Sequence, residues 1–295
     1  MHVDLTLAVA VAFLVSMAVC RVVMALGPRD GPTEDRKRHQ APTPTSGGIG
    51  IGAGFGAAIL TLLIFSLVWR NQISNQGLTM LWVSVLFAYP LLFVGVFDDA
   101  RGLSAQFKFV VYAVLSLAAA WMMGVVREIH VGEWVLVLPF AVGLLGTALW
   151  VFTAINVVNF MDGANGLSMG AVALGLLALA ALAAEGGSAS ALALALSGAG
   201  ALAGFLVWNF PKGRLFAGDS GALFAGAIAA FSSLIVIART GVSPLVAAIV
   251  FFPLLADALL TLTHRIASGR SLMVGHTEHL YQLLIACGWS HARTR

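Results

Sequence analysis

Charged side chains are scarce in this sequence. The 295 residues include 16 Lys and Arg and 13 Asp and Glu, together 10% of the chain, whereas a soluble domain carries about 25%. Hydrophobic residues make up 60%, and the mean hydropathy is +0.95. So few charges cannot cover a surface exposed to water. The composition therefore excludes a soluble cytosolic enzyme, a disordered chain and a nucleic-acid-binding protein.

Cysteine is nearly absent as well. The two cysteines, Cys20 and Cys287, are too few and too apolar in their setting for a disulfide framework. The chain also lacks a basic run before its first apolar segment, and that segment is longer than the core of a signal peptide. We therefore interpret it as a retained helix.

Long apolar runs are abundant. A membrane-spanning helix takes about 20 mostly apolar residues. We therefore expect an all-α, polytopic bundle of about nine or ten transmembrane helices, forming a single domain over residues 1–295. A short segment at 127–135 alternates polar and apolar residues and predicts a small hairpin at the lipid interface. The expected spans are roughly 4–27, 46–69, 78–97, 107–126, 136–158, 166–184, 189–210, 219–239 and 243–265.

Lys and Arg are distributed unevenly between the connectors. Because each span crosses once, alternate connectors share a side of the membrane. One set holds twelve basic residues, counting those at its edges, and the other set holds three. The positive-inside bias predicts that the basic set is cytoplasmic and that the N-terminus is periplasmic. The basic set comprises 28–45, 98–106, 159–165, 211–218 and 266–295.

Polar motifs gather in or beside this same set of connectors. The first is the pair Asp98 and Asp99, which ends one apolar segment shortly before Lys108 opens the next. Adjacent carboxylates repel each other, so a divalent cation, a basic partner or a raised pKa is expected there. A plain solvated helix end is the alternative.

The second motif runs from Asn156 through Asn159 and Asp162 to Asn165. Its three-residue spacing would place the first three side chains on one helix face. Amides in lipid are costly unless they are hydrogen-bonded, and the two glycines after Asp162 let the backbone approach a ligand closely. Packing between helices would explain the asparagines but not the Asp-Gly-x-Asn-Gly turn.

The third motif, Phe216-Ala217-Gly218-Asp219-Ser220-Gly221, opens a span. A helix start of this kind offers amides to an anion and a carboxylate to a metal, although a simple N-cap is the alternative. The fourth contains Arg270, His276 and His279. Two histidines without a cysteine do not complete a zinc site, so binding of a phosphate or sugar is favoured over a purely polar loop.

The fifth motif is a basic run at 36–39, which positive-inside topology also explains, followed by Pro-Thr-Pro-Thr-Ser-Gly-Gly at 42–48. Taken together, the motifs supply oxygen ligands, scattered cations and glycine turns on one face. Oxygen ligands favour Mg²⁺, with Mn²⁺ as the alternative, and cations beside them suit a diphosphate. The apolar helices suggest a lipid co-substrate. The residues alone therefore predict phosphoryl transfer at the cytoplasmic membrane surface.

In order and spacing, the five motifs resemble those of the polyprenyl-phosphate N-acetylhexosamine-1-phosphate transferases (glycosyl transferase family 4), a superfamily that includes the phospho-N-acetylmuramoyl-pentapeptide transferases. The resemblance covers Pro42 to Gln282, and residues 276–282 are similar to the branch that initiates O-antigen or related cell-wall polymers. It implies transfer of a sugar 1-phosphate from a UDP-N-acetylhexosamine to undecaprenyl phosphate in the inner membrane, with release of UMP. It also suggests a homodimer.

The resemblance also implies individual roles. Asp98 is the expected base, Asp99 and Asp162 complete the catalytic acids, and Asp219 with Asn156 binds Mg²⁺. The interpretation requires the four acids to lie close enough to surround one ion. The expected substrate-binding residues are Lys108, Asn156, Asn159, Asn165, Phe216, Arg270, His276 and His279.

Two departures from the family pattern stand out. Asn165 occupies a position where several relatives carry an aspartate, and the chain either ends in a short interfacial helix at 279–289 or is truncated before a final membrane helix. Three alternatives remain open: a phospho-N-acetylmuramoyl-pentapeptide transferase, an aromatic prenyltransferase, and an ion-coupled transporter. An aromatic prenyltransferase needs two Asp-rich D-x-x-x-D motifs, and the segment from Asp98 to Gly102 lacks the trailing acid. A transporter would use an ion path through Asp98, Asp162, Asp219 and Asp257, but only Asp257 lies well inside a span.

Overall fold

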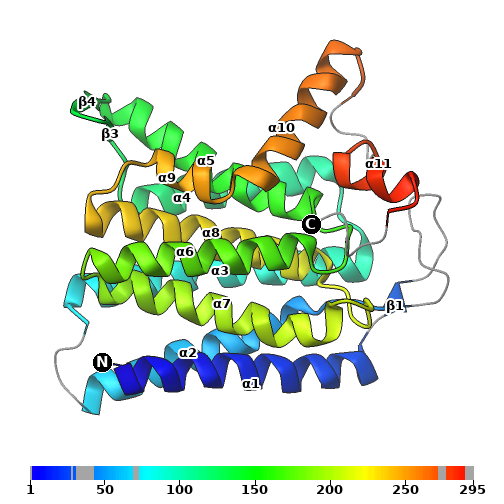
Figure 1. Cartoon of the computed structure of the whole chain (residues 1–295), viewed down its shortest axis with the longest axis horizontal. Coiled ribbons are helices and arrows are strands. Elements are labelled where there is room, and N and C mark those ends of the chain that lie inside the picture. Colours follow the sequence, from blue (N-terminus) through cyan, green and yellow to red (C-terminus); the bar gives the residue numbers. More distant parts are fainter. Residues whose placement is uncertain (1, 28, 31–42, 69–72, 272–276, 290–295) are drawn as a thin grey trace.

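The computed structural model describes residues 2–27, 29–30, 43–68, 73–271 and 277–289 (Figure 1). Within these residues, eight helices are long and apolar enough to cross a membrane. They confirm the predicted all-α, multi-pass bundle. The helices are α1 (His2–Leu26), α2 (Gly48–Val68), α3 (Asn75–Arg101), α4 (Ala105–Met123), α5 (Phe140–Phe160), α6 (Leu167–Glu185), α7 (Ala189–Asn209) and α8 (Gly218–Thr240).

The ninth predicted span, 243–265, is not one helix. The chain forms α9 (Leu245–Val250), turns at Phe251, and continues as α10 (Phe252–Ala267). The break has a local cause, because Pro253 has no N–H to donate and its ring obstructs the carbonyl four residues earlier. Helix α10 leans away from the bundle instead of completing the crossing (Figure 1). The described part of the chain therefore has eight helices of spanning length and not the expected nine or ten.

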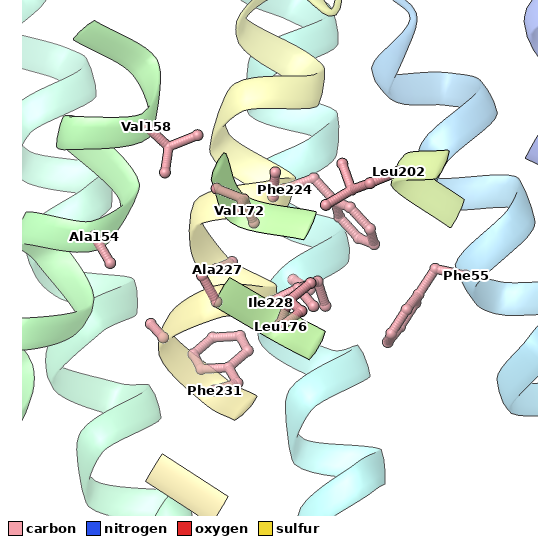
Figure 2. Close-up of a cluster of buried hydrophobic side chains, with 14 of the residues drawn as sticks. Phe55, Ala154, Val158, Val172, Leu176, Leu202, Phe224, Ala227, Ile228 and Phe231 are labelled. Atoms are coloured by element: carbon pink, nitrogen blue, oxygen red, sulfur yellow. The ribbon is translucent and has the colours of Figure 1, made fainter. Parts of the chain in front are cut away.

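Helix α8 lies at the centre of the bundle. Every residue from Ser220 to Val236 is buried, and α8 packs against α3, α5, α6 and α7. Figure 2 shows Phe224, Ile228 and Phe231 of α8 surrounded by side chains from neighbouring helices. Since lipid tails are as apolar as leucine, such packing is driven by close contact, which the many Ala and Gly residues allow.

Two short hairpins complete the described fold. Strand β1 (Arg29–Asp30) pairs with β2 (Thr43–Pro44), and β3 (Glu128–Val131) pairs antiparallel with β4 (Trp134–Val137). The second pair confirms the hairpin predicted near 127–135. It lies at the same end of the bundle as the N-terminus (Figure 1).

The connectors that carry the predicted site residues gather at the opposite end, near the short helix α11 (Leu280–Ala286) (Figure 1). The parity of the spans predicts this arrangement. Which side of the membrane this end faces stays a prediction from the loop charges.

Candidate functional site

Asp99, the second acid of the pair, acts as a cap for a helix far away in sequence. Its Oδ1 accepts from the backbone N–H of Asp219 at 2.8 Å, and its Oδ2 accepts from the backbone N–H of Ser220 at 3.4 Å. Two hydroxyl groups also donate to Oδ2, Ser220 Oγ at 2.8 Å and Ser46 Oγ at 3.1 Å. Asp99 therefore satisfies the first N–H groups of α8 and places a negative charge at its positive end.

Glycines allow α3 and α8 to approach this closely. A side chain at Gly95, one turn before Asp99, would overlap the backbone of Asp219 and Ser220. Gly218 has a positive φ of 71°, and a Cβ there would lie 2.5 Å from Asp99 Oδ2. Glycine is thus required at both positions, for space at the first and for conformation as well at the second.

Asp98 points to a different partner. Lys108 Nζ donates to Asp98 Oδ2 at 2.5 Å and to Asp219 Oδ2 at 3.2 Å, so one ammonium joins the two carboxylates. The backbone N–H of Leu103 donates to Asp98 Oδ1 at 2.6 Å. The side chains of Asp98, Lys108 and Asp219 are 6%, 25% and 33% exposed, so the cluster opens to solvent mainly at Asp219.

Residues 43–48, from β2 to the start of α2, bond to the chain just before α8, and we call them the strap. Phe216 N–H donates to Pro44 O at 2.9 Å, Gly47 N–H to Phe216 O at 2.9 Å, and Gly48 N–H to Ala217 O at 3.0 Å. These bonds explain the Pro-Thr-Pro-Thr-Ser-Gly-Gly motif as far as the structure describes it, from Thr43 onward. The strap places the hydroxyl of Ser46 within hydrogen-bonding distance of Asp99, and it holds the half-buried Phe216 in place.

The loop between α5 and α6 carries Asp162 to the same region. Ser168 Oγ donates to Asp162 Oδ1 at 2.5 Å. The pKa of Asp162 is raised to about 7, mainly by burial and also by the charges of Asp219 and Asp99, although the hydrogen bond from Ser168 lowers it. Asn159 is half-buried nearby on α5, and Asn156 donates its amide N–H to Phe152 O at 2.7 Å, one turn back on the same helix.

Sequence reasoning missed Asn209, Ser46 and Ser168. Asn209 Oδ1 accepts from Gly166 N–H at 2.6 Å, and its Nδ2 donates to Leu215 O at 2.9 Å, so it joins the loops that carry Asp162 and Asp219. An amide at the end of an apolar run, directly before Phe210-Pro211, was the available signal. Asn165 Nδ2 also contacts this region, donating to Pro211 O at 3.4 Å.

The described residues of the fourth motif are paired with other side chains of the protein. His279 is 3% exposed, and its Nδ1 lies 3.1 Å from Asp257 Oδ1. Arg270 is half exposed and pairs with Glu278 at 2.5 Å. Burial raises the pKa of Glu278, but Arg265 and Arg270 outweigh it and hold that pKa below its usual range. His276 lies outside the described residues, and substrate binding by Arg270 and His279 stays a prediction.

The described residues contain no cluster of three or more His, Cys, Asp or Glu arranged to hold a metal ion. The expectation that Asp98, Asp99, Asp162 and Asp219 surround one ion is therefore not met in the described residues, where both oxygens of Asp99 instead accept from α8 and Ser46. The donor set still fits Mg²⁺, which binds through one or two carboxylates together with waters and substrate phosphates rather than in an all-protein cage.

Comparison with known proteins gives consistent matches. The family model for glycosyl transferase family 4 matches residues 80–237, which include the site from Asp98 to Asp219. A probable undecaprenyl-phosphate N-acetylglucosaminyl 1-phosphate transferase of Bacillus subtilis is 27% identical, over 96% of this chain and 79% of its own. A decaprenyl-phosphate N-acetylglucosaminephosphotransferase of Mycobacterium tuberculosis is 28% identical, over 88% and 69%. A phospho-N-acetylmuramoyl-pentapeptide-transferase of Moorella thermoacetica is 29% identical, over 96% and 86%.

Proposed function

The chain belongs to glycosyl transferase family 4, and from that premise we propose that it transfers N-acetylhexosamine 1-phosphate from a UDP-sugar to undecaprenyl phosphate. The products are UMP and an undecaprenyl-diphospho-sugar. The observation that carries the proposal is the shared ammonium of Lys108 between Asp98 and Asp219 at one end of a membrane bundle.

In this reaction an oxygen of the lipid phosphate attacks the β-phosphorus, the one bonded to the sugar. A new P–O bond forms there, the bond from that phosphorus to the bridging oxygen breaks, and the electron pair leaves on UMP. The second pKa of a phosphate monoester is about 6, so the lipid phosphate is largely ionised near neutral pH. Asp98 as a base therefore contributes modestly, by taking the last proton from the monoanion.

Charge balance supports a divalent cation at this site. Asp98 and Asp219 share one ammonium, so the cluster is net negative and would by itself repel a diphosphate. Asp219, the more exposed of the two acids, and Asn156 would hold Mg²⁺ or Mn²⁺. A bound cation would offset the charge of the phosphates and orient them for in-line attack.

The remaining assignments follow the resemblance. Phe216 is placed against the uracil, and Asp162 and Asn159 belong to the polar surface beside the nucleotide. The last connector serves the sugar and diphosphate through Arg270, His276 and His279. Asn165, in the loop between α5 and α6, is a further substrate-binding residue.

We also propose that the reaction is the first membrane step in making a cell-surface polymer, O-antigen or another cell-wall polysaccharide, at the inner membrane. The names of the Bacillus and Mycobacterium relatives support the N-acetylglucosamine version. The Moorella relative keeps phospho-N-acetylmuramoyl-pentapeptide transfer as a second candidate.

The test uses purified full-length protein with Mg²⁺ and undecaprenyl phosphate. It is offered UDP-GlcNAc, UDP-GalNAc, other UDP-N-acetylhexosamines and UDP-N-acetylmuramoyl-pentapeptide in separate reactions, and UMP release is measured. We expect release with an N-acetylhexosamine donor that requires the lipid phosphate and stops in EDTA. UMP release with the pentapeptide donor alone would establish the second candidate, and no release with any donor would refute both.

A further inference from the structure

Helix α10 exposes apolar side chains and buries polar ones. Leu259, Leu260 and Ile266 are 55%, 65% and 63% exposed. Yet Asp257, Thr261 and Arg265 are only 7%, 5% and 4% exposed. These three residues, spaced four apart, lie on one face of the helix, and we refer to them as the polar stripe. Ionisable groups in such surroundings are costly unless they are paired.

Asp257 pairs with the start of α11. Its Oδ1 accepts from the backbone N–H of Leu280 at 2.9 Å and lies 3.1 Å from His279 Nδ1. Its Oδ2 accepts from the backbone N–H of Tyr281 at 3.2 Å. The hydroxyl of Thr261 donates to Oδ1 at 3.2 Å. One carboxylate thus serves the first turn of a helix more than twenty residues later.

Arg265 fixes the chain just before that helix. Its Nη1 donates to Glu278 Oε2 at 2.8 Å, and its Nη2 donates to the backbone carbonyl of Ser271. The polar stripe therefore holds the chain at Ser271, Glu278, His279 and the start of α11. The polar stripe is therefore the surface on which α11 and the residues just before it dock.

Tyr281 connects α11 to the candidate active site. Its ring is 3% exposed, and its hydroxyl donates to Phe160 O at 3.3 Å. A side chain at Gly163 would overlap the Tyr281 hydroxyl, so the ring lies directly against the backbone next to Asp162. A continuous set of contacts runs from Asp257 through Tyr281 to the loop that carries Asp162.

We propose that Asp257 is a positioning residue for the transfer reaction. By holding α11 through the polar stripe, it fixes Tyr281 against the α5–α6 loop and so sets the position of Asp162. This inference rests on the proposed function. It also accounts for the acid inside the ninth apolar segment without an ion path, because Asp257 is fully engaged in docking α11.

The test compares Asp257→Asn with Thr263→Val, a matched control on α10 whose hydroxyl bonds only to the carbonyls of its own helix, Leu259 and Leu260. Amide hydrogen exchange of Leu280 and Tyr281 reports the docking, and UMP release reports the reaction. In Asp257→Asn we expect faster exchange at both amides and a kcat lowered about 10- to 100-fold. The KM for undecaprenyl phosphate should change less than about twofold, because uniform binding is untouched. The control should match the wild type in every measurement.

Two further variants separate positioning from a loss of folding. Asp257→Glu keeps the carboxylate and should recover part of the lost kcat. Tyr281→Phe removes only the hydroxyl, and its effect on kcat should largely disappear in the Asp257→Asn background if both act on one loop.

Faster exchange with unchanged kcat would show that the docking has no catalytic consequence and would overturn the proposal, as would unchanged exchange. If the wild type releases no UMP with any donor, the proposed function fails and the positioning claim falls with it. The exchange rates would still decide whether Asp257 holds α11.

Discussion

Replacing Asp99 with asparagine separates a capping role from a chemical one. The carboxylate accepts from the N–H groups of Asp219 and Ser220 and from the hydroxyls of Ser220 and Ser46. Asparagine has the same shape but only one acceptor oxygen. If that oxygen keeps the two hydroxyls, its NH₂ group faces the N–H of Asp219, which is left without its acceptor.

The expected loss follows from those contacts. An unsatisfied buried donor costs about 1–3 kcal/mol, and removing the negative charge at the start of α8 costs about 0.3–1 kcal/mol more. Asp99→Asn should therefore lose about 1–4 kcal/mol of stability. Thermal unfolding of the protein in detergent and EDTA should show that the Tm of Asp99→Asn is several degrees below that of the wild type.

Asp98→Asn is the matched control. In that variant Lys108 keeps its partner Asp219, and asparagine can still accept from the N–H of Leu103, so the fall in Tm should be smaller than in Asp99→Asn. UMP release should nevertheless fall strongly, because Lys108 loses one of the two groups that orient it. Asp99→Asn with a wild-type Tm and no activity would refute the capping role and show that Asp99 acts on the substrate directly.

Three more predictions concern neighbouring positions. Asp219→Ala should abolish UMP release and its dependence on Mg²⁺, and near-normal Mg²⁺-dependent turnover would rule out the ligand role. Gly163→Ala should displace Tyr281, whose hydroxyl its Cβ would meet, and lower kcat at least as much as Tyr281→Phe; equal activity of Gly163→Ala and wild type would contradict the contact. The third prediction is a pH dependence. Burial raises the pKa of Asp162 from its ordinary 3.8 to about 7, so the folded state keeps the proton that the unfolded state loses between these values. Wild type should therefore lose stability relative to Asp162→Asn as the pH rises from 4 to 7, by at most about 4 kcal/mol; a constant difference in Tm between the two proteins over this range, measured in EDTA, would show that Asp162 is not buried as a neutral acid.

The bundle and the grouping of the motifs were predictable from the sequence. Apolar length predicts nine spans, eight of which are helices of spanning length. The alternation of connectors predicts that Asp98, Asp162 and Asp219 lie at one end. The break in the ninth span was also visible at Pro253. Hydropathy alone does not detect it, because one proline hardly changes the mean of an apolar segment.

The separate roles of Asp98 and Asp99 were not predictable. Successive residues on a helix point about 100° apart, so the two acids face different neighbours, Lys108 on α4 and the start of α8. Only the helix packing decides which acid faces which neighbour. A partial signal was Gly95, which lies one turn before Asp99 and therefore on the same face.

The role of Asp257 was equally hidden, because its partners are backbone groups 23 and 24 residues later. Hydrophobicity patterns carry no information on such a pairing. An isolated acid in an apolar segment looks the same whether it conducts an ion or docks a helix.

The strap has a consequence for biosynthesis. Ser46 leaves the ribosome early, but its acceptor Asp99 follows 53 residues later, and Ser220 follows Asp99 by a further 121 residues. The site around Asp99 therefore cannot form before α8 has been synthesised. Until then, the polar groups of the strap stay solvated at the membrane surface. Contacts of such separation are slow to form. Nascent chains that are stalled before residue 220 should thus insert into the membrane but lack an assembled active site.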